Sequence, residues 1–247
     1  MFGFRFIRKS QKKSGKSMIV VSYPVFPYQP ALELQEKIHS LRKQNKIEDC
    51  LLLLEHPPTI TIGKNGDVQN VLFSKKMLQQ LGVQIHQIGR GGDVTYHGPG
   101  QLVGYPILDI RSYSKGVKEF IHTIEEVFIH WLQDQYHIDA RHDSQYTGVW
   151  VGDQKITAIG FQISRFITMH GFAFNLNTDL NHFKWINPCG IVDKGVTSLK
   201  QLTGEEQSRD IVEKNIIRWI EELFQTRCKS LSPEAFMDYI RQKELSV

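Results

Sequence analysis

Apolar residues follow two spacings along the first half of the chain, and these predict both helices and strands. Leu34, Ile38 and Leu41 recur at helical spacing within residues 29–44, which predicts a helix. The next stretch, "DCLLLLEHPPTITIG", reads as a buried strand, a Pro-Pro break and a short alternating strand, and we expect a hairpin there. Apolar residues then mark one face of residues 117–132, which is the clearest helical pattern in the chain.

The second half contains three strand-like runs followed by two helical ones. The strand patterns cover residues 149–151, 155–163 and 166–177, with a Gly152-Asp153-Gln154 turn between the first two, and we expect them to pair consecutively and antiparallel. Helices are predicted over 211–224 and 236–240, the latter capped by Ser232 with Pro233 at its first position. Strands interrupted by only a few helices indicate a single α+β domain with a mixed or antiparallel β-sheet flanked by helices.

The segment Arg90–Leu102, "RGGDVTYHGPGQL", is unusually rich in glycine and lies between two predicted strands, 83–88 and 102–110. Such a backbone suits either an ordinary loop or a ligand that lies against the main chain, and composition alone does not separate the two. The segment lacks the lysine of a Walker loop, and it precedes a strand where a dinucleotide fingerprint would open a helix. The sequence therefore gives no support for a phosphate-binding loop.

The charge of the chain is concentrated in its first residues. The 247 residues carry a formal net charge of +4, but residues 1–17 hold six basic and no acidic side chains, and the remaining 24 basic and 26 acidic residues nearly balance. This distribution argues against nucleic-acid binding. Residues 1–17 are interpreted as a disordered extension or a targeting segment, with the folded domain over 18–247. Since no apolar run is long enough to cross a membrane, we expect no membrane association and a cytoplasmic protein, or a mitochondrial one if the basic segment is a presequence.

The cysteines and histidines give no metal or disulfide signature. Cys50, Cys189 and Cys228 form no C-x-x-C pair, and the ten histidines show no common ligand spacing. We therefore expect at least one free thiol and no metal.

Five motifs in order resemble those of the lipoyl(octanoyl) transferases, a branch of the biotin/lipoate protein ligase superfamily. They are "EHPPTITIGKNG", "RGGDVTYHGPGQLVGYPI", "GVWVGDQKITAIG", "TMHGFAFNL" and "INPCG". Five ordered motifs are far more specific than any one of them. The resemblance implies the catalytic-domain fold of that superfamily, and an enzyme that moves an octanoyl group from acyl carrier protein to a lysine of a lipoyl domain.

The resemblance also implies site residues. Cys189 matches the nucleophile that carries the acyl group as a thioester, and Lys155 matches the residue that lowers the pKa of that thiol and serves as acid and base. Three segments are expected to bind the acyl substrate, namely Arg90, Gly91, Gly92, Asp93, Val94, Thr95, Tyr96 and His97; Ala158, Ile159 and Gly160; and Gly171, Phe172 and Ala173. For Arg90 a role in bracing the loop stays open, and His170 is not assigned to the site.

The implied partners are octanoyl-acyl carrier protein as donor and, as acceptors, the lipoyl domains of 2-oxoacid dehydrogenase complexes and the glycine cleavage H protein. No ATP or metal is expected, because transfer from a thioester to an amine is downhill. Three alternatives stay open: an ATP-dependent lipoate ligase of the same fold, an enzyme that moves acyl groups between carrier domains, and a non-catalytic module that holds acylated carriers.

Overall fold

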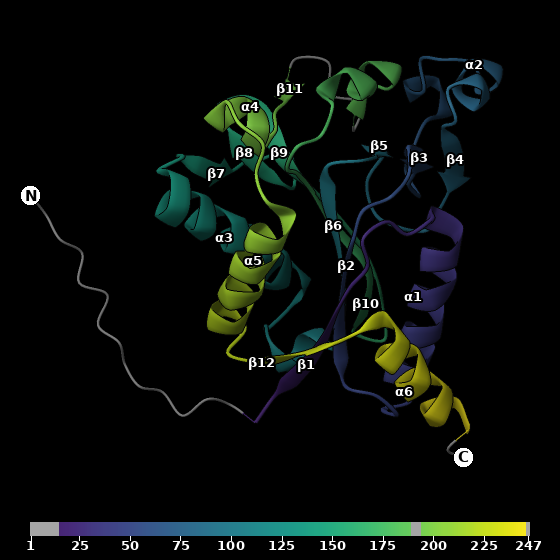
Figure 1. Cartoon of the computed structure of the whole chain (residues 1–247), viewed down its shortest axis with the longest axis vertical. Coiled ribbons are helices and arrows are strands. Elements are labelled where there is room, and N and C mark those ends of the chain that lie inside the picture. The colour runs from purple at the N-terminus through teal and green to yellow at the C-terminus, as the bar shows by residue number, and fades with distance from the viewer. Residues whose placement is uncertain (1–14, 189–193, 246–247) are drawn as a thin grey trace, which may run out of the picture.

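A large mixed β-sheet forms the centre of the protein. The computed structural model describes residues 15–188 and 194–245. In that part of the chain the sheet has nine strands, in the order β12-β1-β2-β6-β10-β9-β8-β7, with β11 paired to β9 (Figure 1). Their bounds are β1 Ser17–Ser22, β2 Asp49–Leu54, β6 Gln101–Ile107, β7 Ala140–His142, β8 Val149–Val151, β9 Gln154–Ser164, β10 Ile167–Asn175, β11 Gly195–Val196 and β12 Arg227–Leu231.

Helices cover both faces of this sheet (Figure 1). The helices α1 Tyr28–Lys43 and α6 Pro233–Leu245 pack on one face, and α3 Val117–Tyr136 and α5 Arg209–Leu223 pack on the other. The short helix α4 Leu199–Thr203 follows β11. Two 3₁₀ turns, η2 Ile110–Ser112 and η3 Leu180–Trp185, follow β6 and β10.

Strand β2 shows why both faces must be covered. All six of its residues are buried, with Leu51 and Leu53 in the core under α3 and α5, and Leu52 and Leu54 in the core under α1 and α6. Side chains alternate between the two faces of a strand, so a continuous run of leucine fits a strand with a hydrophobic layer on each side.

A smaller sheet lies beside the main one and joins strands that are close in sequence. It has the order β4-β3-β5, with β3 Thr59–Ile62, β4 Gln84–Gln87 and β5 Val94–His97, and it packs with the helix α2 Lys75–Gln80 and with η3. The 3₁₀ turn η1 Val68–Asn70 lies between β3 and α2 in the chain and has no buried residue. The predicted hairpin of the two strands around Pro57-Pro58 is therefore wrong. Strand β2 pairs with β1 and β6, whereas β3 pairs with β4 and β5, so the Pro-Pro break directs the chain from one sheet to the other.

The other predicted elements are found close to their expected bounds, and the α+β class is confirmed. Strands β8, β9 and β10 pair consecutively and antiparallel, and the Ser232 hydroxyl accepts a hydrogen bond from the Ala235 amide at the start of α6. Strand β1 begins at Ser17, one residue before the expected start of the folded domain. The glycine-rich segment was expected to be a loop throughout, but its residues 94–97 form β5.

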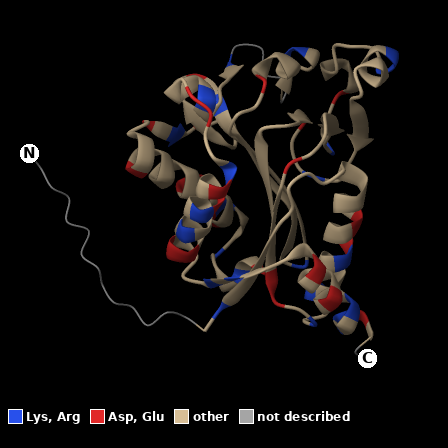
Figure 2. Ribbon diagram, in the orientation of Figure 1, with Lys and Arg blue, Asp and Glu red and all other residues tan. Residues whose placement is uncertain are grey.

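Basic and acidic side chains are interspersed along α5 and α6 (Figure 2), in keeping with the nearly balanced charge of the sequence after residue 17. Over the described ranges, no helix has the length and apolar character that a membrane crossing requires.

Candidate active site

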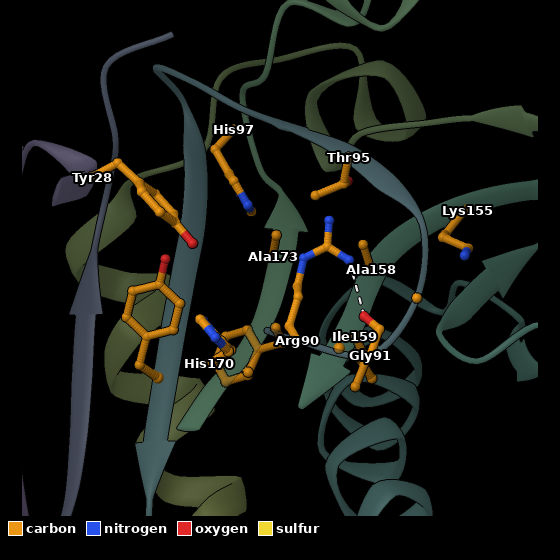
Figure 3. A pocket seen from close by; sticks show the side chains of 15 residues that line it. Tyr28, Arg90, Gly91, Thr95, His97, Lys155, Ala158, Ile159, His170 and Ala173 are labelled. Carbon is orange, nitrogen blue, oxygen red and sulfur yellow. Dashed lines mark hydrogen bonds between the residues drawn. The ribbon is translucent and has the colours of Figure 1, made fainter. Parts of the chain in front are cut away.

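The three segments expected to bind the acyl substrate come together around one cavity. Strands β9 and β10 are antiparallel neighbours, and their register pairs Gly160 with Gly171 and Ala158 with Ala173. The amide of Gly91 donates a hydrogen bond to the Phe161 carbonyl at 3.0 Å, which attaches the glycine-rich segment to the same strands. The cavity encloses about 520 Å³ of empty space, part of it open to solvent, and residues of all three segments line it (Figure 3).

Strand alternation separates the side chains of the first segment into two sets. Thr95 and His97 line the cavity, whereas Val94 and Tyr96 belong to the hydrophobic core of the smaller sheet. Alternate side chains of β5 point in opposite directions, so a run of consecutive residues cannot all face the substrate. Asp93 does not line this cavity and instead accepts a hydrogen bond from the Asp67 amide at 3.0 Å.

Arg90 braces the glycine-rich segment and also lines the cavity. Its side chain is buried, and one terminal nitrogen donates to both the carbonyl and the hydroxyl of Thr61 at 2.9 Å. Its other terminal nitrogen donates to the Gly91 carbonyl at 3.0 Å (Figure 3). The bracing role left open by the sequence is therefore real, and it places a guanidinium group in the wall of the cavity.

Glycine occupies two positions of the segment, 92 and 98, for different structural reasons. Gly92 has a φ of +86°, a backbone conformation that suits glycine best. At Gly98 a Cβ atom would lie 1.9 Å from the Tyr96 hydroxyl oxygen, so this glycine makes room for a tyrosine of the core and not for a ligand. The glycine content of the segment thus reflects internal packing as well as the cavity.

A chain of hydrogen bonds runs from His97 to the strand that follows residues 189–193. His97 Nδ1 is 2.9 Å from Gln101 Oε1, Gln101 Nε2 donates to Asn175 Oδ1 at 3.0 Å, and Asn175 Nδ2 donates to the Thr197 carbonyl at 2.9 Å. Because an amide oxygen only accepts, Nδ1 of His97 carries the proton, and Nε2 is the acceptor of the neutral ring. Burial, reinforced by nearby His56, holds the pKa of His97 well below its usual range.

His170 belongs to the cavity although the sequence analysis left it out. It is buried, it lines the cavity, and its backbone has a φ of +63°, which is unusual for a residue other than glycine. Its Nε2 atom has no hydrogen-bond partner in the described part of the chain. Burial, with Arg90 and His39 nearby, lowers the pKa of His170 to about 4, so the ring is neutral at pH 7. Its place in the "TMHGFAFNL" motif, next to Gly171, was the available signal.

Two tyrosines were also missed. Tyr28 opens α1 and Tyr105 lies in the middle of β6, and both line the cavity, with Tyr28 on the side opposite Lys155 (Figure 3). The Tyr105 hydroxyl is 2.7 Å from His56 Nε2, and His56 Nδ1 is 2.6 Å from the Phe26 carbonyl. Tyr105 lies within the second quoted motif, which was the available signal for it, whereas nothing in the sequence near Tyr28 distinguishes it from a core residue.

Lys155 stands at the boundary of two cavities. It lines the cavity described above, and it also lines a neighbouring hollow with about 950 Å³ of empty space, part of it open to solvent, that extends to Val117 and Tyr146. Its side chain is buried, and its amine lies 4.8 Å from the centre of the Trp150 ring. A cation over an aromatic face is held electrostatically, which fixes the amine between the two cavities.

Cys189 lies outside the described residues, so its position relative to Lys155 is not described. The strand β11 that follows runs parallel to β9, and its Val196 is the register partner of Lys155. Lys194 lies 4.7 Å from the centre of the Trp150 ring, the same ring that Lys155 contacts. The other two cysteines are free, and burial raises the pKa of Cys228 to about 12 and that of Cys50 still further, as expected for structural thiols.

Comparison with protein families places most of the chain in one family. Residues 27–221 match the family described as the lipoyl protein ligase A/B catalytic domain. The matched range includes all three cavity-lining segments, Lys155 and Cys189.

Individual relatives agree with this match. The chain is 51% identical over 217 residues to a protein named octanoyltransferase from Caldicellulosiruptor saccharolyticus, covering 87% of this chain and 92% of that one. It is 52% identical over 197 residues to an octanoyltransferase from Desulforamulus reducens, covering 80% and 86%.

Solved structures show the same fold at low sequence identity. A bipartite lipoate protein ligase of Thermoplasma acidophilum superimposes with a TM-score of 0.69 at 15% identity, covering 92% of this chain and 91% of that one. A lipoate-protein ligase A bound with ATP gives a TM-score of 0.68, also at 15% identity, covering 92% and 93%. On the family match and the two close relatives, the chain belongs to the lipoyl protein ligase A/B catalytic domain family.

Proposed function

We propose that the protein transfers an octanoyl group to a lysine of a lipoyl domain, by way of a thioester on Cys189. The observation that carries this proposal is the meeting of three sequence-distant segments and Lys155 around one cavity, in a chain about half identical to proteins named octanoyltransferase. The cavity is lined by small and apolar side chains of β9 and β10, which suits an acyl chain.

The chemistry divides into two exchanges at one carbonyl carbon. The Cys189 thiolate attacks the thioester of the donor, a new carbon–sulfur bond forms, and the carrier thiol leaves with a proton from Lys155. The acceptor amine then attacks the Cys189 thioester, an amide forms, and Cys189 leaves as thiolate while Lys155 takes a proton from the amine. One lysine thus returns to its starting state in each cycle.

Residues of the cavity would hold the acyl chain and its carbonyl group in place for these steps. The acyl chain would lie between β9, β10 and the glycine-rich segment, with Lys155 at the rim where the carbonyl must sit. An ammonium close to a thiol stabilises the thiolate, which is the nucleophilic form. His97 and His170 offer neutral imidazole nitrogens inside the cavity, which can accept or donate a hydrogen bond without adding charge.

The proposed donor is octanoyl-acyl carrier protein, and the proposed acceptors are the lipoyl domains of 2-oxoacid dehydrogenase complexes and the glycine cleavage H protein. The archaeal ligase of the same fold was solved in a study of its system with an E2 lipoyl domain, which favours an acceptor of that type. The proposed reaction needs neither ATP nor a metal, since the donor is already activated. Both named relatives are bacterial, which favours the cytoplasm and gives no support to a mitochondrial presequence.

One experiment separates this function from its alternatives. The purified protein is incubated with octanoyl-acyl carrier protein, and its intact mass is measured with and without hydroxylamine treatment. We expect a hydroxylamine-labile octanoyl adduct that is absent in Cys189→Ala. A ligase would instead need octanoate and ATP to modify a lipoyl domain, and a binding module would form no adduct under either condition.

A second measurement tests the role assigned to Lys155. In Lys155→Ala the alkylation of Cys189 by iodoacetamide should slow at pH 7 and recover as the pH approaches about 8.5, the ordinary value of a free thiol. Octanoyl transfer should recover less, because the proton shuttle is also lost. If iodoacetamide alkylates Cys189 equally fast in Lys155→Ala and in the wild type across this pH range, Lys155 does not lower the pKa of the thiol.

A further inference from the structure

A cluster of two histidines and one glutamate lies outside the acyl cavity, where α3 meets β7. His122 and Glu125 are one turn apart on α3, and His142 ends β7, next to α3 at the left of the main sheet in Figure 1. Glu125 Oε2 is 3.3 Å from His122 Nδ1 and 2.7 Å from His142 Nδ1. One potential ligand atom from each residue lies within 4.8 Å of those of the other two.

We propose that His122, Glu125 and His142 bind Zn²⁺. Two imidazole nitrogens and one carboxylate oxygen are a set that zinc accepts, leaving its fourth position to water. Bonds of about 2.0–2.1 Å in a tetrahedral site separate neighbouring ligand atoms by about 3.3 Å. The His122–Glu125 separation already has this value, and the His142–Glu125 separation reaches it with a movement of about 0.6 Å.

The groups around the three residues orient them as ligands. His142 Nε2 donates to Glu126 Oε1 at 2.6 Å, and His142 Nδ1 donates to Glu125 Oε2 at 2.7 Å, so zinc would replace the proton on Nδ1 while Nε2 keeps its bond to Glu126. The second oxygen of Glu125 accepts from the Gly148 amide at 2.8 Å, and Oε2, which both histidines approach, faces the place where the metal would bind. A histidine that donates its outer N–H to a carboxylate is the usual arrangement in protein metal sites.

The exposures of the three side chains fit a site that can be loaded from solvent. The Glu125 side chain is only 5% exposed, while those of His142 and His122 are 31% and 47% exposed. The buried carboxylate is fixed in place and the two imidazoles open toward water, so an ion has an entry path. The sequence could not reveal this site, because its third ligand is 17 positions from the second and on another element.

A metal here would connect α3 to the wall of the acyl site. Glu125 holds the Gly148 amide, and Gly148 lies against the catalytic-site lysine, since a Cβ atom at Gly148 would be 3.3 Å from Lys155 Cε. Zinc would therefore cross-link α3 with β7 and stiffen the backbone on which the Lys155 side chain rests. The site itself does not depend on the proposed acyl transfer.

Calorimetry on the chelator-treated full chain tests the proposal, with ZnCl₂ as the titrant and MgCl₂ as the control. We expect binding of one Zn²⁺ that weakens at least about 100-fold in His122→Ala and in His142→Ala, and by about 10–100-fold in Glu126→Gln. His130→Ala is the matched control, because His130 lies on α3 and contacts Glu126 but not Glu125. Its affinity should equal that of the wild type.

Two further readouts distinguish this site from the thiols of the chain. Co²⁺ bound by nitrogen and oxygen ligands gives visible d–d bands without the near-ultraviolet charge-transfer band of a cobalt–thiolate bond. Zn²⁺ should also raise the melting temperature of the wild type and of His130→Ala, but not that of His122→Ala. Equal zinc affinity in wild type and His122→Ala, or no binding by the wild type, would show that the cluster is only a hydrogen-bonded anchor.

Discussion

His170 combines a strained backbone with a side chain that has an unused polar atom inside the acyl cavity. A positive φ at a residue other than glycine costs about 1–3 kcal/mol, and such residues concentrate at functional sites. The neighbouring strand offers a comparison, because Phe166 has a φ of +67° in the exposed turn between β9 and β10. The same backbone conformation thus occurs at His170 in the cavity and at five described residues away from it, namely Asn45, His137, Arg165, Phe166 and Gln225.

We expect His170→Asn to lower kcat/KM for octanoyl transfer by about tenfold or more, equivalent to about 1.4 kcal/mol of transition-state stabilisation. Asparagine tolerates the left-handed backbone, so the variant should fold, but its shorter side chain cannot reach where Nε2 lies. Phe166→Gly should relieve the same strain without affecting kcat/KM. Steady-state kinetics and urea unfolding of both variants provide the check. Full activity in a folded His170→Asn would contradict a role in the reaction.

At the scale of elements, the cavity is assembled by hydrogen bonds between side chains of different strands. Gln101 of β6 and Asn175 of β10 connect β5 to the carbonyl of Thr197, just after β11. Both side chains are buried. A buried polar group left without its partner costs about 1–3 kcal/mol, so these strands depend on each other for their positions.

Asn175→Ala should therefore destabilise the protein by about 1–3 kcal/mol, because both the Thr197 carbonyl and the Gln101 amide lose their hydrogen-bond partner. It should also change the alkylation rate of Cys189, since Thr197 anchors the chain a few residues after that cysteine. Asn215→Ala is the control, because Asn215 makes a similar bond to the Ile211 carbonyl on the exposed side of α5. Urea unfolding and iodoacetamide kinetics measure the two effects. Equal stability of both variants would refute this coupling.

The elements differ in how far the sequence predicts them. Helix α3 was predicted closely because its pattern is local and long. The pairing of β2 and β3 was not, because each strand finds its partners elsewhere: β2 in β1 and β6, β3 in β4 and β5. Strand β5 was hidden among glycines, since its pairing with β3 overrides the loop-like composition around it.

The candidate site shows the same limit. The resemblance predicts three segments that would bind the acyl substrate, together with Lys155, and the structure brings these residues around one cavity. The side chains of β5 alternate between the cavity and the core of the smaller sheet. Val94 and Tyr96 point into that core and therefore do not face the cavity. Tyr28 reaches the cavity from α1 only in the folded protein, and no local pattern indicates it, whereas Tyr105 of β6 lies within the second motif.

At the scale of the whole molecule, three histidines are buried in or next to the cavity: His97 and His170 line it, and the His56 ring lies 5.7 Å from the His97 ring. Burial lowers the pKa of His56 to about 4 and that of His170 to about 4, and holds the pKa of His97 well below its usual range. Their rings must lose their protons when the chain folds at mildly acidic pH. The stability of the protein is therefore linked to the protonation of histidines in and beside the cavity.

The sign of this linkage predicts acid sensitivity between pH 6.5 and about 4. In that range the unfolded chain holds protons on these histidines that the folded protein does not, so the free energy of unfolding falls as the pH falls, by up to about 1.4 kcal/mol per pH unit for each histidine. Above pH 6.5 these histidines are neutral in both the folded and the unfolded protein, so their contribution to stability no longer changes with pH.

His56→Gln should reduce the pH dependence of the free energy of unfolding by the share of one histidine, because a glutamine amide can donate to the Phe26 carbonyl and accept from Tyr105 without titrating. Urea unfolding at several pH values measures the slope, with the half-exposed His130→Gln as control. If His56→Gln keeps the wild-type slope, His56 does not titrate as its burial requires.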